Sequence, residues 1–332
     1  MNKNIFKNKS ILITGGTGSY GYALTNYFIK KKYPFRKIII FSRDELKQFM
    51  MKKKLNDKKY HNLRYLIGDV RDKGRLKTAF NDVDFIVHAA ALKQVNAAEY
   101  NPIEFIKTNV IGAQNIVECA LESNISKIIA LSTDKASSPT NLYGATKLCS
   151  DKIFINANNI VGKKNLKFSV LRYGNVMGSR GSVLNEFLEQ KKRGELYISD
   201  KLVTRFHIDL QNAIDISIVG LSKMLGGEIF IPKIKSYKLL ELAKAVCENC
   251  KIKNTGLSAG EKLHEEMISL NEIRNTYDLG NYYVIVDGIN VKKYKKYKKI
   301  IKKKAYTSDT NEFIKYDELK KVVLKYKADL AV

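Results

Sequence analysis

The chain has 332 residues, of which 45% are hydrophobic, and it is long enough for one large α/β domain or for two lobes that share a core. Only a short apolar run follows the first lysines, and no apolar stretch approaches the ~20 residues of a membrane helix, so we exclude a secretory signal and a membrane span and expect a cytoplasmic protein. The net charge of +26 would suit a nucleic-acid partner, but the excess is of lysine rather than of arginine, which is preferred for bidentate base and phosphate recognition, so we expect none.

Short β-rich runs alternate with longer amphipathic segments through residues 1–175. We predict strands at 10–14, 37–41, 63–67, 85–88, 127–131 and 168–171. One helix is predicted to open at Asn101-Pro102 and another to run over 143–157. Strands separated by helical crossovers indicate an α/β fold with a Rossmann-type, doubly wound parallel sheet, which binds ligands at the carboxyl ends of its strands near the topological switch point.

The first predicted strand runs into a glycine-rich turn with the spacing GxxGxxG. Gly15 would permit the tight turn, Gly18 the approach of the backbone to a pyrophosphate, and Gly21 the close packing of the next helix. That helix would turn its N–H groups and its positive dipole end toward the phosphates. The turn therefore predicts dinucleotide binding, with contacts from Gly15, Thr17, Gly18, Ser19, Tyr20 and Gly21.

The end of the second predicted strand favours NADP over NAD. An NAD site usually has an acid there for the ribose 2′-hydroxyl, whereas this chain has Ser42 and Arg43, with Lys47 one helical turn later. One hydroxyl and two cations suit a 2′-phosphate. Asp44 is the exception, and we interpret it as the N-cap or first turn of the next helix. After the third strand, Asp69 lies where an acid that contacts adenine is expected.

The fifth predicted strand leads into a serine- and threonine-containing turn and then into Tyr143 and Lys147, which share one helix face because they are four residues apart. A nearby ammonium group would lower the pKa of the tyrosine and make it a base for a hydroxyl proton, and the lysine would also hold the nicotinamide ribose. The same spacing recurs at Tyr294 and Lys298. The position after the fifth strand, rather than the spacing, therefore supports the catalytic interpretation.

Beyond Asn175 the regular alternation ends. We predict a loop at 178–181, a strand at 203–208, and a strand at 227–232 (GEIFIP) that returns to the main sheet. These expectations give an NADP-binding Rossmann domain at 1–175, with a returning segment near 208–235. A substrate-binding lobe would be formed by 176–207 and 236–332.

Two further features of the second half carry no predicted catalytic role. Cys247 and Cys250 form a CxxC, but no second ligand pair with zinc spacing accompanies them, so we expect no metal and interpret the pair as helix packing. The segment 292–304 interleaves lysines with tyrosines and isoleucines. We interpret it as a solvated helix or loop face, with surface attraction to polyanions as the alternative.

The motifs taken together resemble a known family. Extended short-chain dehydrogenases carry the early glycine turn, a serine or threonine after the fifth strand, and the Tyr/Lys pair. Within them, the chain closely resembles the inverting UDP-N-acetylglucosamine 4,6-dehydratase/5-epimerases. The matching segments span most of the chain and are SRDELKQ (42–48), GDVRD (68–72), HAAALKQV (88–95), AEYNP (98–102), LSTDKA (131–136), NLYGATK (141–147), RYGNVMGSRGS (172–182), TRF (204–206) and GEKLHE (260–265).

One pair within these motifs separates the inverting from the retaining dehydratases. Retaining sugar dehydratases generally place Asp-Glu after the fifth strand, whereas the inverting family has Asp-Lys, as at Asp134-Lys135 here. The departures from the family pattern are modest. Asn96 stands where proline is common, His207 where the family often has tryptophan, and 257–258 (Leu-Ser) where Arg-Ala or Arg-Pro is usual.

The resemblance implies roles for individual residues. The implied catalytic residues are Thr133, Asp134, Lys135, Tyr143 and Lys147. Further implied cofactor contacts are Val70, Ala89 and Ala90. The implied contacts to uridine diphosphate are Lys93, Asn175, Arg180 and Arg205, although surface ion pairs are the alternative for Lys93, Arg180 and Arg205. Glu265, beside His264, would either line the uridine-side pocket or stabilise the lobe.

The resemblance also implies a mechanism. Tyr143 would deprotonate the sugar 4-hydroxyl, beside Thr133, while NADP+ takes the hydride from C4. A neutral Lys135 would remove the C5 proton and a protonated Asp134 would protonate the departing 6-hydroxyl, so a desolvated pocket should lower the pKa of the lysine and raise that of the aspartic acid. Hydride return to C6 and reprotonation of C5 on the opposite face would give UDP-2-acetamido-2,6-dideoxy-β-L-arabino-hex-4-ulose.

Two other functions are compatible with parts of the sequence. A UDP-sugar 4-epimerase would share the fold and the Tyr/Lys pair, but its product would keep the 6-hydroxyl. A non-enzymatic redox-sensing or polyanion-binding scaffold would leave Asp134, Lys135 and Tyr143 idle. The resemblance favours the dehydratase, with UDP-N-acetylglucosamine as substrate, a homo-oligomeric assembly (dimer or hexamer), and downstream sugar-nucleotide enzymes as partners.

Overall fold

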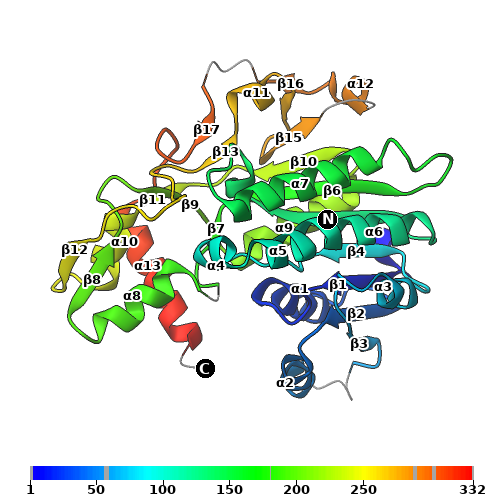
Figure 1. Ribbon diagram of the computed structural model, residues 1–332, viewed down its shortest axis with the longest axis horizontal. Helices are drawn as coiled ribbons and strands as arrows, with labels where there is room; N and C mark the ends of the chain where they lie inside the picture. Colours follow the sequence, from blue (N-terminus) through cyan, green and yellow to red (C-terminus); the bar gives the residue numbers. More distant parts are fainter. Residues whose placement is uncertain (1–2, 56–59, 180, 287–289, 301–303, 331–332) are drawn as a thin grey trace.

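The computed structural model describes residues 3–55, 60–179, 181–286, 290–300 and 304–330 (Figure 1). Its strands are β1 (Ser10–Thr14), β2 (Lys37–Ser42), β3 (Leu63–Ile67), β4 (Phe85–His88), β5 (Lys127–Thr133), β6 (Lys167–Tyr173), β7 (Asn175–Val176), β8 (Glu195–Ile198), β9 (Thr204–Ile208), β10 (Glu228–Pro232), β11 (Ser236–Lys238), β12 (Lys251–Asn254), β13 (Glu266–Ile268), β14 (Thr276–Asp278), β15 (Tyr282–Val286), β16 (Lys298–Lys299) and β17 (Tyr306–Thr307). Its helices are η1 (Lys3–Phe6), α1 (Ser19–Lys30), α2 (Glu45–Leu55), α3 (Lys73–Ala79), α4 (Val95–Tyr100), α5 (Pro102–Phe105), η2 (Ile106–Ile111), α6 (Gly112–Leu121), η3 (Asp134–Ala136), α7 (Leu142–Ala157), α8 (Val183–Lys191), α9 (Leu210–Lys223), α10 (Leu239–Val246), α11 (Leu270–Ile273), α12 (Val291–Tyr294) and α13 (Tyr316–Leu330).

The main sheet has ten strands in the order β16-β14-β15-β10-β6-β5-β4-β1-β2-β3. Seven neighbouring strands of this sheet, β10-β6-β5-β4-β1-β2-β3, pair in parallel, which confirms the predicted doubly wound sheet. The topological switch point lies between β1 and β4. The predicted return of the GEIFIP segment is also confirmed, because β10 pairs in parallel with β6. The sequence analysis did not foresee that β15, β14 and β16 extend this edge in antiparallel fashion, since it assigned 236–332 to the lobe.

Both faces of the sheet are covered by helices. Ile11 and Ile13 of β1 belong to a core that also contains residues of α1, α2 and α9. Leu12, between them, points to the opposite face and joins a core with residues of α3, α6 and α7. Because successive side chains of a strand alternate between faces, a strand buried on both sides has to be continuously apolar, as β1 is.

A smaller region lies beside the carboxyl ends of the central strands (Figure 1). It contains the three-stranded sheet β11-β9-β7 and the pairs β12-β8 and β13-β17. Its own core packs α8, α10 and α13 together through residues such as Phe187, Leu242 and Val323. This region places residues of the second half of the chain over the end of β5, where the functional turn begins.

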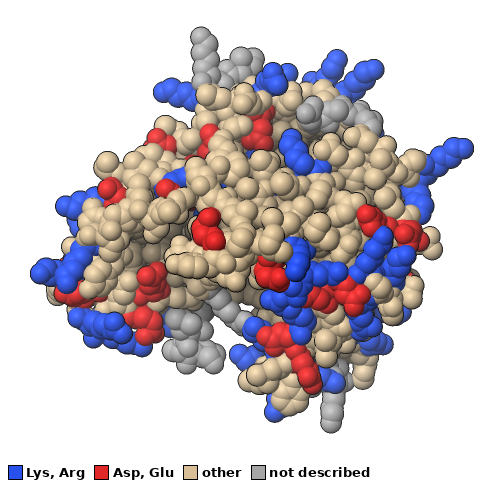
Figure 2. All heavy atoms as spheres, viewed as in Figure 1, with Lys and Arg blue, Asp and Glu red and all other residues tan. Residues whose placement is uncertain are grey.

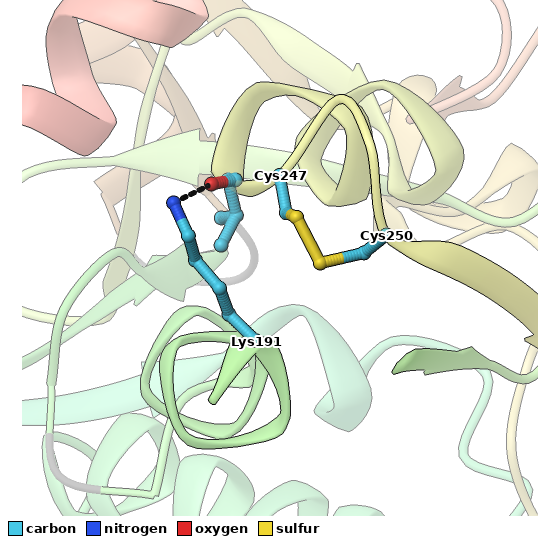
Figure 3. The surroundings of a disulfide bond; sticks show 4 residues. Lys191, Cys247 and Cys250 are labelled. Carbon is cyan, nitrogen blue, oxygen red and sulfur yellow. Dashed lines mark hydrogen bonds between the residues drawn. A yellow bond between two sulfur atoms is a disulfide. The ribbon is translucent and has the colours of Figure 1, made fainter. Parts of the chain in front are cut away.

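The CxxC lies outside a helix, so the interpretation as helix packing is wrong. α10 ends at Val246, and Cys247 has an extended backbone with φ −155°. Cys247 and Cys250 form a disulfide that brackets the turn from α10 into β12 (Figure 3). The Lys191 ammonium of α8 donates to the carbonyl oxygen of Val246 at 3.1 Å, so the end of α10 is held from both sides.

Replacing Cys247 and Cys250 together with serine is expected to lower the free energy of unfolding by about 2 kcal/mol, because the disulfide closes a short loop in the unfolded chain. Urea unfolding without reductant would measure the difference. Cys149→Ser, at an exposed free cysteine, is the matched control and should leave the midpoint unchanged. Identical midpoints for the wild type with and without reductant would contradict the expectation.

The surface carries many lysines, and those of the 292–304 segment that the structure describes are exposed. Tyr294 of the same segment is buried and donates to Glu228 at 3.0 Å, so this segment is anchored by its aromatic residue while its lysines face solvent. On the face seen in Figure 2, basic side chains lie mostly around the margin and alternate with acidic ones. In the described part of the chain, every helix is too short or too polar to cross a membrane.

Candidate active site

The glycine turn has the geometry that its spacing predicts. Gly15 has φ +63°, and a Cβ on it would lie 2.8 Å from the amide nitrogen of Ala90. A Cβ on Gly21 would lie 2.6 Å from the Cα of Gly16, so α1 packs directly on the turn. Ala89 and Ala90, which follow β4, donate their N–H groups to the hydroxyl of Thr14 at 3.2 Å each. The turn is thus fixed between β1 and β4, at the switch point of the sheet.

The other side chains of the turn differ in their surroundings. Thr17 is buried, and Tyr20 donates its hydroxyl to Ser217 of α9 at 2.6 Å. The hydroxyl of Tyr20 is therefore already used in a hydrogen bond to α9. Its predicted cofactor contact is left to the backbone, which opens α1 together with Ser19.

The residues expected to favour a 2′-phosphate are placed unequally. The Arg43 side chain is 57% exposed and lies 3.8 Å from Asp69. Lys47 instead pairs with Asp44 at 2.6 Å, and Asp44 accepts the Lys47 N–H at 2.9 Å, which confirms Asp44 as the cap of α2. Ser42 is buried and accepts from the Gln48 amide at 3.1 Å. Arg43 is thus the cation of this set that best matches the predicted role.

Asp69 is engaged by a residue that the sequence analysis did not consider. The backbone N–H of Arg71 donates to one carboxylate oxygen at 3.0 Å, and the Arg71 guanidinium holds the other at 2.8 Å. Burial raises the pKa of Asp69, but hydrogen bonding from Arg71 and the charges of Arg71 and Arg43 outweigh it, so the net shift is downward. Val70, next in the chain, is buried and accepts from Asn115 through its carbonyl oxygen.

The turn after β5 places the predicted acid and base side by side. Thr133 ends the strand, caps η3 by accepting the Lys135 N–H, and donates to Oδ1 of Asp134 at 3.0 Å. The Lys135 ammonium donates to the same Oδ1 at 3.1 Å, to Oε1 of Glu265 at 2.9 Å and to the amide oxygen of Asn175 at 3.5 Å. Glu265 and Asn175, both expected to contact substrate, therefore surround Lys135.

Charge and burial set the protonation of this cluster. Burial raises the pKa of Asp134 despite the charge of Lys135, as predicted for an acid that has to keep its proton. For Lys135 the predicted direction is wrong. Burial lowers its pKa, but the carboxyl groups of Asp134 and Glu265 raise it by more, so this structure favours the ammonium form.

Tyr143 and Lys147 lie on α7, which is capped by Asn141 through the N–H of Gly144 at 2.8 Å. An added Cβ on Gly144 would overlap the Lys135 carbonyl oxygen, so the helix packs tightly on the catalytic turn. Burial raises the pKa of Tyr143 to about 12, while the charge of Lys135 and a hydrogen bond with Thr133 oppose the shift. The predicted lowering of this pKa by Lys147 is therefore wrong, because burial dominates and the opposing charge is that of Lys135.

Lys147 itself is buried and donates to the carbonyl oxygen of Leu131 at 2.8 Å, and burial lowers its pKa. Asp151 and Arg172, to which the sequence predictions gave no role, form a buried network with this part of α7. Asp151 accepts from Ser132 at 2.7 Å and lies 3.6 Å from Arg172, which also pairs with Glu272 at 3.0 Å. This buried network ties α7, β5 and β6 to α11. Asp151 lies one turn after Lys147 on the same buried helix face. A charged residue on a face that is predicted to be buried is a sequence feature that could have identified Asp151.

The remaining predicted substrate residues differ in position. Arg205 is buried, and its guanidinium donates to the Thr204, Lys262 and Leu263 carbonyl oxygens and to Glu261 at 2.7 Å, so it holds the 261–265 segment. Lys93 is exposed at its surface. Partial desolvation and the charge of Lys135 lower its pKa, so it interacts electrostatically with Lys135. Arg180 lies outside the described residues.

Comparisons with known proteins show the family to which the chain belongs. Residues 11–287 match the family model described as "Polysaccharide biosynthesis protein". The chain belongs to this family. A Campylobacter jejuni protein (subsp. jejuni serotype O:23/36, strain 81-176) named UDP-N-acetylglucosamine 4,6-dehydratase (inverting) is 53% identical over 289 residues, 86% of this chain and 85% of that protein. The family resemblance predicted from the motifs is thereby confirmed.

Other proteins similar to this chain carry a different name or have a solved structure. A Rickettsia bellii (strain OSU 85-389) protein named UDP-glucose 4-epimerase is 39% identical, with 96% of each chain covered. The X-ray structure of Pen from Bacillus thuringiensis superposes with a TM-score of 0.90 at 34% identity, covering 97% of this chain and 98% of that one. Proteins similar to this chain thus carry the names of both enzyme classes, the dehydratase and the 4-epimerase.

Proposed function

We propose that this family member is a UDP-N-acetylglucosamine 4,6-dehydratase that inverts C5. The observation that carries the proposal is the ion pair of the buried Asp134 with the partly buried Lys135. The pair lies beside Thr133 and within the electrostatic reach of Tyr143 at the end of β5. Loss of water across C5 and C6 needs an acid and a base besides the residue that serves C4 oxidation, and this pair supplies them.

The chain's own residues would divide the work as follows. Tyr143 accepts the proton of the sugar 4-hydroxyl, which Thr133 orients. For this Tyr143 first has to lose its own proton, because burial raises its pKa, while the charge of Lys135 opposes that rise. Asp134, kept protonated by burial, gives its proton to the departing 6-hydroxyl. Lys135 takes the C5 proton, for which it first has to lose its own. Lys93, which interacts electrostatically with Lys135, and Asn175, which accepts from it, would orient the diphosphate or the sugar.

NADP is the proposed cofactor, and it would supply a site for the hydride between C4 oxidation and reduction at C6. The turn between β1 and α1 has the tight glycine geometry of a dinucleotide-binding turn. A side chain on Gly15 would collide with the backbone at Ala89 and Ala90, so only glycine permits this turn. The residues that would hold the cofactor are Gly15, Thr17, Gly18, Ser19, Tyr20, Gly21, Ser42, Arg43, Asp69, Val70, Ala89, Ala90, Tyr143 and Lys147. Lys47 has a weaker claim because of its pairing with Asp44.

Arg43→Ala is expected to weaken NADP binding by about 10- to 100-fold while changing NAD binding little, because a charge-assisted contact to the 2′-phosphate is lost. Fluorescence titration with both cofactors would measure the two dissociation constants. Lys47→Ala is the matched control and should have the smaller effect. Equal losses for NADP and NAD in the Arg43 variant would rule out the assignment.

A UDP-sugar 4-epimerase is the alternative function, and it is supported by the Rickettsia relative. Epimerisation at C4 includes no loss of water and so requires neither an acid for the 6-hydroxyl nor a base for the C5 proton. Asp134 and Lys135 therefore favour the dehydratase. Mass spectrometry of the product made from UDP-N-acetylglucosamine separates the two. Loss of one water is expected, whereas a product of unchanged mass would favour epimerisation.

The organisation of the protein remains part of the proposal. We propose a nucleotide-binding domain over 1–175 with a returning segment near 208–235, and a substrate-binding lobe from 176–207 and 236–332, although β14–β16 of the latter lie in the main sheet. Assembly as a homodimer or homohexamer follows from the family resemblance. Enzymes that consume the 4-keto sugar nucleotide would be the functional partners.

A further inference from the structure

Glu265 is a buried carboxylate from the second half of the chain that lies against the catalytic turn. Its side chain is 3% exposed, and Oε1 lies 2.9 Å from the Lys135 ammonium. The backbone of Glu265 exchanges hydrogen bonds with Ser308 at 2.8 and 2.9 Å, and Ser308 is bonded to Thr204. Two separate segments therefore fix this carboxylate against Lys135.

The ammonium thus lies between two carboxyl groups, one from each half of the chain. Oδ2 of Asp134 and Oε2 of Glu265 are both buried and lack a hydrogen-bond partner among the described residues. Neither carboxyl group is therefore saturated by the protein. Because net charge is costly to bury, a cluster of two acids and one amine with so little access to water is most stable with a small net charge.

The remaining charges around Glu265 decide which acid is ionised. Arg205 lies 3.8 Å from Oε1, and Lys262 acts on Glu265 at longer range, as Lys93 does on Lys135. Burial raises the pKa of Glu265, but Lys135 and Arg205 outweigh it and the net shift is downward, whereas that of Asp134 is upward. The favoured state has a protonated Asp134, an ammonium at Lys135 and an ionised Glu265.

We propose that Glu265 is a positioning residue that holds the Lys135 amine and accepts its proton, so that Lys135 becomes the neutral base for C5. The inference rests on the proposed dehydratase function. In this step an N–H bond of the ammonium breaks and an O–H bond forms on Oε1. The amine and the carboxylic acid that result are both neutral, and the cluster keeps its number of protons and its net charge.

The transfer also explains how a lysine held as an ammonium can serve as a base without losing a proton to solvent. The Lys135 side chain is 19% exposed, so a bound sugar that covers it would remove the remaining water from the cluster. Desolvation penalises the separated charges of the Lys135–Glu265 pair and favours the two neutral groups. In the wild type, the formation of the base is therefore internal and should not depend on the pH around neutrality.

The test is Glu265→Gln, which keeps the size and a hydrogen-bonding oxygen but cannot take up a proton. We expect kcat for water loss to fall roughly 100-fold, with KM and single-turnover C4 oxidation nearly unchanged. In the variant Lys135 has to lose its proton to solvent, so kcat should rise with pH above neutrality while the wild-type profile stays flat. Glu265→Asp should restore part of kcat and the flat profile.

Glu266→Gln is the matched control, because this neighbouring carboxylate accepts from Ser137 and Ser138 and makes no ion pair with Lys135 among the described contacts. It should keep the wild-type pH profile. If Glu265→Gln does not fold, a rising profile in Glu265→Asp would overturn the proposal and a flat one would support it. A wild-type kcat and profile in Glu265→Gln would overturn the role of Glu265 alone. A wild-type protein that forms no dehydrated product would overturn the proposed function, and this inference with it.

Discussion

Lys135→Ala is expected to lower the rate of water loss by roughly 10²- to 10⁴-fold, because the base for the C5 proton is removed. C4 oxidation should persist, so the 4-keto sugar and the reduced cofactor should accumulate together in a single turnover. Mass spectrometry of the quenched sugar nucleotide and absorbance of the reduced cofactor would follow the two steps separately.

The same substitution leaves Asp134 and Glu265 buried without the ammonium between them. We expect the pKa of both carboxyl groups to rise, because an unpaired buried charge is costly, and the variant should be less stable near neutral pH than the wild type. Thermal unfolding is therefore the necessary control. A folded Lys135→Ala protein that dehydrates the substrate at the wild-type rate would contradict the assignment of the base.

Tyr143→Phe is expected to block the first oxidation by roughly 10²- to 10⁴-fold, because the hydroxyl that accepts the C4 proton is lost. The ring packs with Ala98 and Phe105, and phenylalanine keeps these contacts, so the fold and the binding of the sugar nucleotide should be retained. Stopped-flow absorbance should show no reduced cofactor in a single turnover.

Tyr173→Phe is the matched control for this prediction, since Tyr173 is another buried tyrosine, at the end of β6. Its C4 oxidation should proceed at nearly the wild-type rate. Formation of reduced cofactor by Tyr143→Phe as fast as by the control would show that another group removes the proton.

The sequence was sufficient for the parts of the fold that depend on local pattern. The bounds of β1, β3 and β4 agree with the prediction because each is a short segment rich in aromatic, β-branched or leucine residues. β14 and β16 were missed because they have only three and two residues and no apolar run. β15 (YYVIV) has the aromatic and β-branched composition of a strand, so the sequence did carry a signal for it, but not for the sheet that it joins. The disulfide was missed because the end of α10 at Val246 is not marked by glycine or proline.

The chemistry of the site was predictable only in part. Thr133, Asp134 and Lys135 follow one another in the chain, so their proximity follows from the turn after β5. The directions of the Lys135 and Tyr143 pKa shifts depend on burial and on Glu265, which reaches the site from a distant segment. No spacing in the sequence reveals such a contact. The pairing of Lys47 with Asp44 is different, because the two residues are only three apart and this spacing could have indicated it.

Isotope labelling tests the central claim most directly, because each label reports a different proposed step. Wild-type enzyme would convert UDP-N-acetylglucosamine in deuterated water, and a second reaction would use substrate deuterated at C4. NMR should show solvent deuterium at C5 of an L-arabino 4-keto product, and the C4 label in its 6-methyl group. A product with the D configuration and no solvent deuterium at C5, or one that keeps its 6-hydroxyl, would contradict the inverting dehydratase and the role of Lys135.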